Sequence, residues 1–234
     1  MSAIVLFMAA IAAIAAWWLS QQRLAAKPWL EKGVIDEYRS GGASPLPPAK
    51  IGLGVFLAVV GSLFALFISA YTMRMELIDW RTLPVPRLLW YNTAVLIVSS
   101  GALQWAQAAA RRDDSDGVLI GLLAGGVSAI VFLAGQLVAW QQLNAAGYFP
   151  ATNPANAFFY LITATHGLHL LGGLVALART TAKAWRGVEI PQLRLSVDLC
   201  TMYWHFLLLV WLVLLALLTG WADDFVAICR QLLT

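Results

Sequence analysis

The chain has 234 residues, of which 61% are hydrophobic and only 12% are charged, and its formal net charge is +3. A soluble domain carries about a quarter charged residues, and one soluble core of this length would leave large apolar patches in water. This composition excludes an ordinary soluble domain and predicts an integral membrane protein. The basic residues lie in short loops between apolar runs, so they act as orientation signals and do not form a nucleic-acid-binding surface.

Six apolar runs reach or approach the roughly 20 residues that a helix needs to cross a bilayer. They cover approximately residues 3–19, 51–73, 88–110, 118–143, 155–178 and 195–219. The first run is the shortest, and no Lys or Arg precedes it, so it lacks the basic region of a signal peptide. We predict an all-α integral membrane protein with six transmembrane helices, namely a five-helix core and one extra N-terminal helix.

The Lys and Arg residues divide unequally between the two sides of this topology. Eleven fall in one set of loops and only four in the other. Because cytoplasmic loops are enriched in Lys and Arg, the first set should face the cytoplasm of a bacterial inner membrane, with both termini outside. The basic residues on the cytoplasmic side are Arg23, Lys27, Lys32, Arg39, Lys50, Arg111, Arg112, Arg179, Lys183, Arg186 and Arg194.

The order of the apolar and polar stretches predicts four parts of the chain. The only long connection carries several Gly and Pro residues together with charges, which is typical of a linker. The predicted parts are an N-terminal transmembrane helix (1–22), a cytoplasmic linker arm (23–50), a five-helix bundle (51–221) and an outer C-terminal tail (222–234).

All three histidines lie within predicted membrane helices. His166 and His169 are three residues apart and share a helix face. His205 lies on the next, antiparallel helix, and Asp198 precedes it by two turns on nearly the same face. Ionisable groups at this depth are costly and tend to be functional. We therefore predict a polar network of these four residues, with Gln136 as a further interhelical hydrogen-bonding residue.

Three interpretations of this cluster are open from the residues alone. Imidazoles on neighbouring helices are suitable ligands for haem or a metal ion. Histidine also titrates near neutrality and so relays protons. The third interpretation is that the side chains fasten helices through buried hydrogen bonds, worth about 0.6–2 kcal/mol each. We favour fastening over a ligand site and over proton transfer.

Several patterns are missing from the sequence. No apolar helix holds a series of carboxylates or basic residues, and no inverted repeat with interrupted helices is evident, so a transporter is disfavoured. There is no phosphate-binding glycine loop and no zinc-protease motif. Cys200 and Cys229 lie near opposite faces of the predicted topology, so we expect two unpaired thiols.

Two motifs lie on neighbouring predicted helices: the stretch 165–169, which is followed by Gly172 and Gly173, and the stretch 203–206 with a tryptophan five residues on. Both resemble signature helices of the haem–copper terminal oxidase subunit III family. Asp198 lies where the family usually has a glutamate. The motif residues are Thr165, His166, Gly167, Leu168 and His169 in the first helix, and Tyr203, Trp204, His205, Phe206 and Trp211 in the second.

Two other helices carry weaker parts of the same resemblance. Asn92-Thr93 and Ser99-Ser100 are similar to a run at the start of one family helix, and Gln136 with Trp140 is similar to part of the next. All of these motifs occur in family order and together cover about 50–220.

The resemblance implies a non-redox structural and accessory subunit of a haem–copper oxygen reductase in aerobic respiratory electron transport, of the cytochrome c oxidase type. Such a subunit packs against the catalytic subunit I and stabilises it, and the chain alone is not catalytic. The implied partners are subunit I, subunit II and membrane lipids. Haem and copper would lie in the partner subunits, with no cofactor in this chain, and bound phospholipid is compatible with the resemblance.

Two alternatives use the same residues differently. An accessory subunit of a nitric oxide reductase can be similar to subunit III. A small membrane anchor for haem b would use His166, His169 and His205 as ligands. Spectra of the isolated chain and the metal content of its complex separate these alternatives.

The chain departs from the family at several carboxylate positions. The helix matching 51–73 normally carries a buried carboxylate, but no acid occurs there, and Gly61 or a neighbour takes the matching place. Ala139 and Leu208 also stand where acids are common. The lone first helix differs from the two-helix leaf of longer members. We expect the structural role to be retained and any role in proton collection to be reduced.

Overall fold

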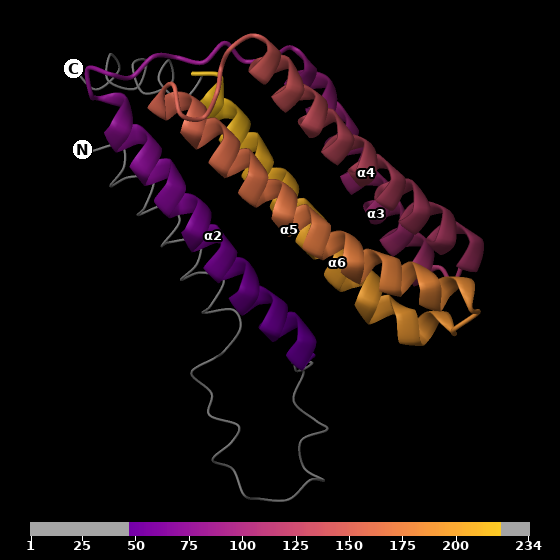
Figure 1. The fold of residues 1–234 in the computed structure, drawn as a ribbon. Coiled ribbons are helices and arrows are strands. Elements are labelled where there is room, and N and C mark those ends of the chain that lie inside the picture. Colours follow the sequence, from indigo (N-terminus) through magenta and orange to yellow (C-terminus); the bar gives the residue numbers. More distant parts are fainter. Residues whose placement is uncertain (1–46, 221–234) are drawn as a thin grey trace, which may run out of the picture. The chain divides into compact units, whose positions relative to one another are not determined.

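The computed structural model describes residues 47–220, which form α-helices joined by turns and short loops (Figure 1). The predicted all-α architecture is confirmed for this part of the chain. The predicted N-terminal helix, most of the linker arm and the whole C-terminal tail lie outside the described residues. The described helices are α2 (Pro48–Met75), α3 (Leu88–Arg111), α4 (Ser115–Ala145), α5 (Pro154–Trp185) and α6 (Ile190–Leu218).

Contacts within the chain form two units, and the boundary lies within α2, between Val59 and Val60. In the first unit the structure describes only residues 47–59, which form the beginning of α2. The second unit contains the rest of α2 and the four helices α3 to α6. The packing and the site described below belong to this second unit.

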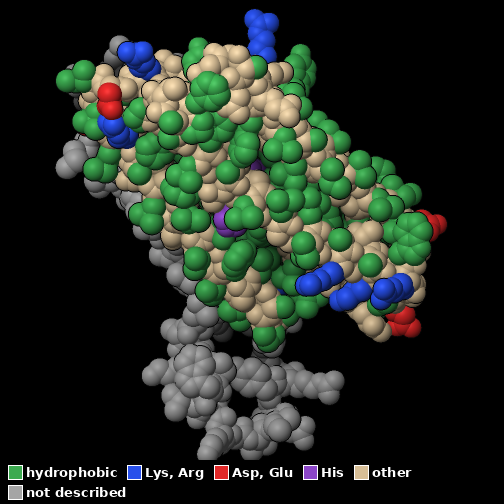
Figure 2. Space-filling view, viewed as in Figure 1, with side chains coloured by type: hydrophobic (Ala, Val, Ile, Leu, Met, Phe, Trp, Pro, Cys, Tyr) green, Lys and Arg blue, Asp and Glu red, His purple; other side chains and the backbone are tan. Residues whose placement is uncertain are grey.

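Four of the described helices, α2, α4, α5 and α6, are long and apolar enough to cross a membrane. The predicted run 88–110 also forms a helix, α3, but this helix is not among the four. Its sequence includes Asn92, Ser99, Ser100, Gln104 and Gln107, which make it more polar than its neighbours. Hydrophobic side chains are spread over the whole described surface visible in Figure 2, with Lys and Arg gathered toward the ends. The chain is therefore a multi-pass membrane protein.

The loops between helices contain the residues that begin and end helices. Asp114 Oδ1 accepts a hydrogen bond of 3.0 Å from the backbone N–H of Gly117 and so caps the start of α4. Asn153 caps α5 in the same way through Ala155 N, and Pro154 occupies the first turn. Gly187 follows α5 with φ +74°, a conformation that glycine adopts without steric cost.

Small residues bring α3 and α4 close together. An added Cβ at Gly121 would lie 2.8 Å from both the carbonyl oxygen of Ala102 and the Cβ of Ala106. An added Cβ at Gly125 would lie 2.9 Å from the Leu103 side chain. Because the glycines have no side chain, the two backbones approach and gain van der Waals contact. This packing fixes the position of the polar face of α3 that carries the site.

Candidate functional site

His205 on α6 is bonded to α3 through both of its ring nitrogens. Nδ1 lies 2.5 Å from the Ser100 hydroxyl oxygen, and Nε2 lies 2.8 Å from Gln104 Oε1. A neutral imidazole with its proton on Nε2 satisfies both contacts, since Nε2–H donates to the amide oxygen and Nδ1 accepts from the hydroxyl. The histidine thus fastens α6 to α3, and these bonds do not require a charge on its ring.

Asp198 lies on the same line of polar contacts between α3 and α6, which we call the α3–α6 seam. Gln107 Nε2 donates to Asp198 Oδ1 over 3.0 Å. Ser100, Gln104 and Gln107 are four and three residues apart on α3, so they form one stripe along that helix. Asp198 and His205 meet this stripe from α6.

The seam continues to the helix ends beside the α3–α4 loop. Arg194 Nε, in the first turns of α6, donates to the Ala110 carbonyl oxygen over 3.0 Å. Arg194 Nη2 also donates to both carboxylate oxygens of Asp113 at 2.9 Å. Polar pairs therefore join α3 to α6 from the loop to the middle of α6.

His166 and His169 make different contacts. His166 is fully buried, and its Nε2 donates to the Leu207 carbonyl oxygen over 3.1 Å. Its ring centroid lies 5.0 Å from that of Trp211. His169 Nδ1 lies 2.8 Å from the Thr165 carbonyl oxygen of its own helix, and the His169 carbonyl accepts from the Tyr203 hydroxyl at 2.8 Å.

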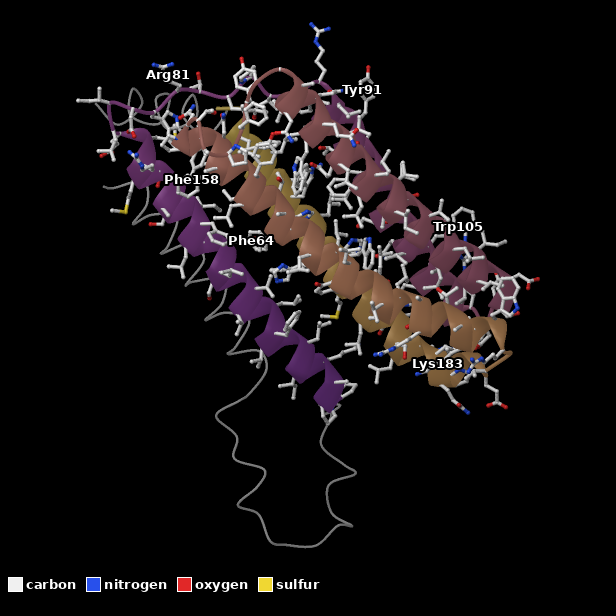
Figure 3. All side chains as sticks on the ribbon, in the orientation of Figure 1. Phe64, Arg81, Tyr91, Trp105, Phe158 and Lys183 are labelled. Atoms are coloured by element: carbon white, nitrogen blue, oxygen red, sulfur yellow. The ribbon has the colours of Figure 1, made fainter. Side chains whose placement is uncertain are left out.

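Phe64 projects from α2 toward α5 and contacts these histidines, with its ring centroid 5.6 Å from that of His169 (Figure 3). The structure thus places the predicted residues in two groups. His166 and His169 bond to main-chain carbonyls of α5 and α6, whereas Asp198 and His205 bond to side chains of α3. The sequence analysis predicted one network of these four residues, but it did not indicate that α3 supplies partners for two of them.

Tryptophan–hydroxyl pairs form a second set of interhelical bonds. Trp204 Nε1 donates to Ser99 Oγ over 3.0 Å, and Trp211 Nε1 donates to Thr93 Oγ1 over 2.9 Å. All four side chains are buried. The sequence analysis named these tryptophans only as motif residues and did not identify their acceptors. The available signal was the group of polar residues Asn92, Thr93, Ser99 and Ser100 within the predicted helix.

Gln136 is buried on α4, and among the described residues neither of its amide atoms has a hydrogen-bond partner. Asn92 Nδ2 and His166 Nδ1 are in the same situation within residues 47–220. The Asn92 amide packs directly over Gly135 of α4. The membership of Gln136 in the polar network therefore stays a prediction.

The remaining motif residues have structural contacts. The Thr165 hydroxyl donates to the Leu161 carbonyl oxygen over 2.8 Å. An added Cβ at Gly167 would lie 3.5 Å from Leu133 of α4. The Phe206 ring would lie 3.7 Å from a Cβ at Gly61, the position that lacks the carboxylate expected from the resemblance. These contacts favour packing as the role of the motifs.

Within residues 47–220, no group of three or more His, Cys, Asp and Glu side chains is arranged to hold a metal ion. Cys200 is buried, with its sulfur 3.6 Å from the Thr180 hydroxyl oxygen, and Cys229 lies outside the described residues. The contacts of His205 and Asp198 are hydrogen bonds between helices. The described geometry therefore favours the fastening interpretation.

The chain is similar to known proteins over most of its length. The family model for cytochrome c oxidase subunit III matches residues 52–223. "Cytochrome c oxidase subunit 3" of Thermostichus vulcanus is 31% identical over 176 residues, which cover 72% of this chain and 85% of that protein. The protein of the same description from Synechocystis sp. is 30% identical over 71% of this chain and 72% of its own length.

A probable cytochrome c oxidase subunit 3 from Mycobacterium tuberculosis is 30% identical over 52% of this chain and 60% of its own length. The family match covers all five described helices apart from the first residues of α2. The chain therefore belongs to the cytochrome c oxidase subunit III family and is an accessory subunit of a haem–copper oxidase, an oxidoreductase complex of the membrane.

Proposed function

We propose that the chain packs against the catalytic subunit I of a cytochrome c oxidase-type oxygen reductase and stabilises it, without carrying out redox chemistry itself. The observation that carries this proposal is the bonding of His205. Both of its ring nitrogens are occupied by side chains of α3. A histidine held in this way contributes rigidity to the bundle, and a rigid bundle is a suitable scaffold for a larger complex.

In this proposal haem and copper lie in the partner subunits, and subunit I and subunit II are the protein partners. The relatives named above are described as subunits of cytochrome c oxidase, which supports that class of complex. Membrane lipids surround the remaining surface, and bound phospholipid is compatible with its apolar character. The names of these relatives also support cytochrome c as the electron donor of the proposed complex.

The proposed topology keeps six spans in a bacterial inner membrane, with both termini outside. α3 is counted as a span because its 24 residues reach about 36 Å at 1.5 Å per residue. Its Ser100, Gln104 and Gln107 side chains are bonded to α6, which reduces the cost of placing them in the membrane. The proposed parts remain the N-terminal helix 1–22, the arm 23–50, the bundle 51–221 and the tail 222–234.

The missing carboxylates favour one alternative. No acid occurs between residues 51 and 73, and a complex that does not pump protons has no need of one for proton collection. An accessory subunit of a nitric oxide reductase is therefore the second candidate function. Copper in the purified complex argues against it.

Affinity purification of the tagged chain in mild detergent tests the proposal, with optical spectra and metal analysis of both the complex and the separated chain. We expect haem and copper in the complex and no haem absorption from the separated chain. A haem band that stays with the separated chain would instead make it a haem-b anchor. A complex with haem and non-haem iron but no copper would support the nitric oxide reductase alternative.

A further inference from the structure

His205 of the α3–α6 seam is exposed at the middle of the membrane-spanning helix α6, and its partner Gln104 on α3 is also exposed. His205 lies 15 residues after the first residue of α6 and 13 before its last, which places it about 20 Å from either end. The His205 ring and the Gln104 side chain are both exposed in the described structure. In hydrocarbon, an exposed polar group is costly unless it is bonded.

The Gln104 amide has more hydrogen-bonding capacity than the seam uses. Its oxygen accepts from His205 Nε2 at 2.8 Å. Its Nε2 carries two N–H donors, and residues 47–220 provide no acceptor for them. Leaving such donors without an acceptor in lipid is unfavourable, because hydrocarbon offers no replacement partner. The position therefore favours contact with an oxygen acceptor from another chain.

Gly101 lies one turn before Gln104 on the same side of α3. It is exposed, and an added Cβ would meet nothing within 4 Å. The exposed residues around it are bulky: Ile97 is 49% exposed and Trp105 is 63% exposed, and Trp105 projects away from α3 in Figure 3. A small residue between bulky ones forms a notch into which a second helix backbone fits.

The outward faces of α4 and α5 differ from this one. Apart from Trp185 at the end of α5, their exposed large side chains are aliphatic, which suits contact with lipid tails. These residues are Ile120, Leu123, Val127, Ile130, Val131, Leu137 and Val138 on α4, and Leu161, Leu168, Leu171 and Val175 on α5. The described structure thus combines unused polar capacity with a glycine notch on the α3–α6 side.

We propose that this side, made by Ile97, Gly101 and Gln104 of α3 with His205 and Leu209 of α6, is the docking surface for a transmembrane helix of the catalytic subunit. That helix lies in the Gly101 notch and presents a neutral oxygen acceptor, either a hydroxyl or a main-chain carbonyl freed at a helix break, to Gln104 Nε2. The inference rests on the proposed function, because it identifies the face through which the chain joins the oxidase.

Filling the notch tests the surface without disturbing the fold of the chain. Gly101→Leu adds a side chain where the chain itself has open space, and Gly172→Leu is the matched control, because Gly172 on α5 is also exposed with nothing within 4 Å. We expect Gly101→Leu to lower the amount of haem–copper subunit that co-purifies about tenfold, the change produced by ~1.4 kcal/mol. Gly172→Leu should leave it unchanged. Wild-type recovery with Gly101→Leu would overturn the inference.

Photo-crosslinking tests the docking surface independently of the proposed function. A photoreactive phenylalanine at Ile97 should crosslink to the catalytic subunit, whereas one at Leu171 of α5, which is 52% exposed, should not. Crosslinking from Leu171 alone would overturn the docking surface and leave the proposed function standing. If the wild-type chain co-purified with no haem–copper subunit at all, both would be wrong.

Discussion

The indole Nε1 of Trp204 on α6 donates a hydrogen bond of 3.0 Å to the hydroxyl oxygen of Ser99, which lies 105 positions earlier on α3. Both residues are completely buried. The Ser99 hydroxyl in turn donates to the Gly125 carbonyl oxygen of α4 over 2.7 Å. One small hydroxyl therefore joins three helices, and each of its bonds lies in an environment without water to replace it.

Ser99→Ala should destabilise the bundle by about 1–2 kcal/mol, because the Trp204 N–H loses its acceptor in the dry core. The measurement is the thermal midpoint of the purified complex in mild detergent. Ser128→Ala, at a half-buried serine of α4 outside this cluster, is the control. Equal midpoints for the two variants would contradict the assigned role of Ser99.

Gly173→Ala and Gly172→Ala should have opposite effects although the residues are adjacent. An added Cβ at Gly173 would lie 2.5 Å from Tyr203 Cε1 and 2.9 Å from Trp204 Cζ3, so the overpacked variant should lose roughly 1–3 kcal/mol. At Gly172 nothing lies within 4 Å, and the better helix propensity of alanine should keep or raise stability. Thermal midpoints of the two variants decide this, and the prediction is wrong if Gly173→Ala is the more stable.

His205→Ala should lower the yield of assembled oxidase and leave the spectrum of the haem that remains unchanged. Ser100 and Gln104 lose their partner on α6, so the α3–α6 seam is weakened while no ligand is removed. Quantifying the complex by immunoblot and recording its optical spectrum provide both readouts, with Leu212→Ala, an exposed residue of α6 outside the docking surface, as the control. Normal assembly with a lost haem band would show that His205 is a ligand.

The ion pair after α2 should give a small pH dependence of stability. Arg74 donates to both carboxylate oxygens of Asp79, at 2.7 and 2.5 Å, and these bonds hold the pKa of Asp79 below its usual range. The ion pair therefore stabilises the fold at pH values above the pKa of Asp79 in the unfolded chain, which is about 4. This contribution is lost as the pH falls through the lower pKa of Asp79 in the folded protein. Asp79 is exposed and Arg74 is partly exposed, so solvent screens the pair and the effect should be modest.

Comparing Asp79→Asn with the wild type across pH measures that contribution. The thermal midpoints should differ slightly at pH 7 and converge in acid, where Asp79 is protonated in both the folded and the unfolded state. A difference that persists unchanged in acid would assign the effect to something other than the carboxylate charge.

The sequence alone determined the membrane class and the helices, because a bilayer of fixed thickness demands apolar runs of fixed length. The predicted runs 88–110 and 155–178 lie within α3 and α5; α3 extends beyond its run by Arg111, and α5 by Pro154 and residues 179–185. The family also followed from the sequence, since its motifs are contiguous residues on single helices. Residues 165–169 and 203–206 needed no knowledge of packing to be recognised.

Only the tertiary structure decided which helix each polar side chain meets. Helical spacing puts Asp198 and His205 on one face of α6, but it does not specify which neighbour that face contacts. The answer depends on the rotation of each helix and on the close approach of α3 to α4 at Gly121 and Gly125. That packing gave His205 its partners on α3 and left His166 to bond a main-chain carbonyl, because hydrogen bonds between helices depend on three-dimensional proximity that the period of one helix does not contain.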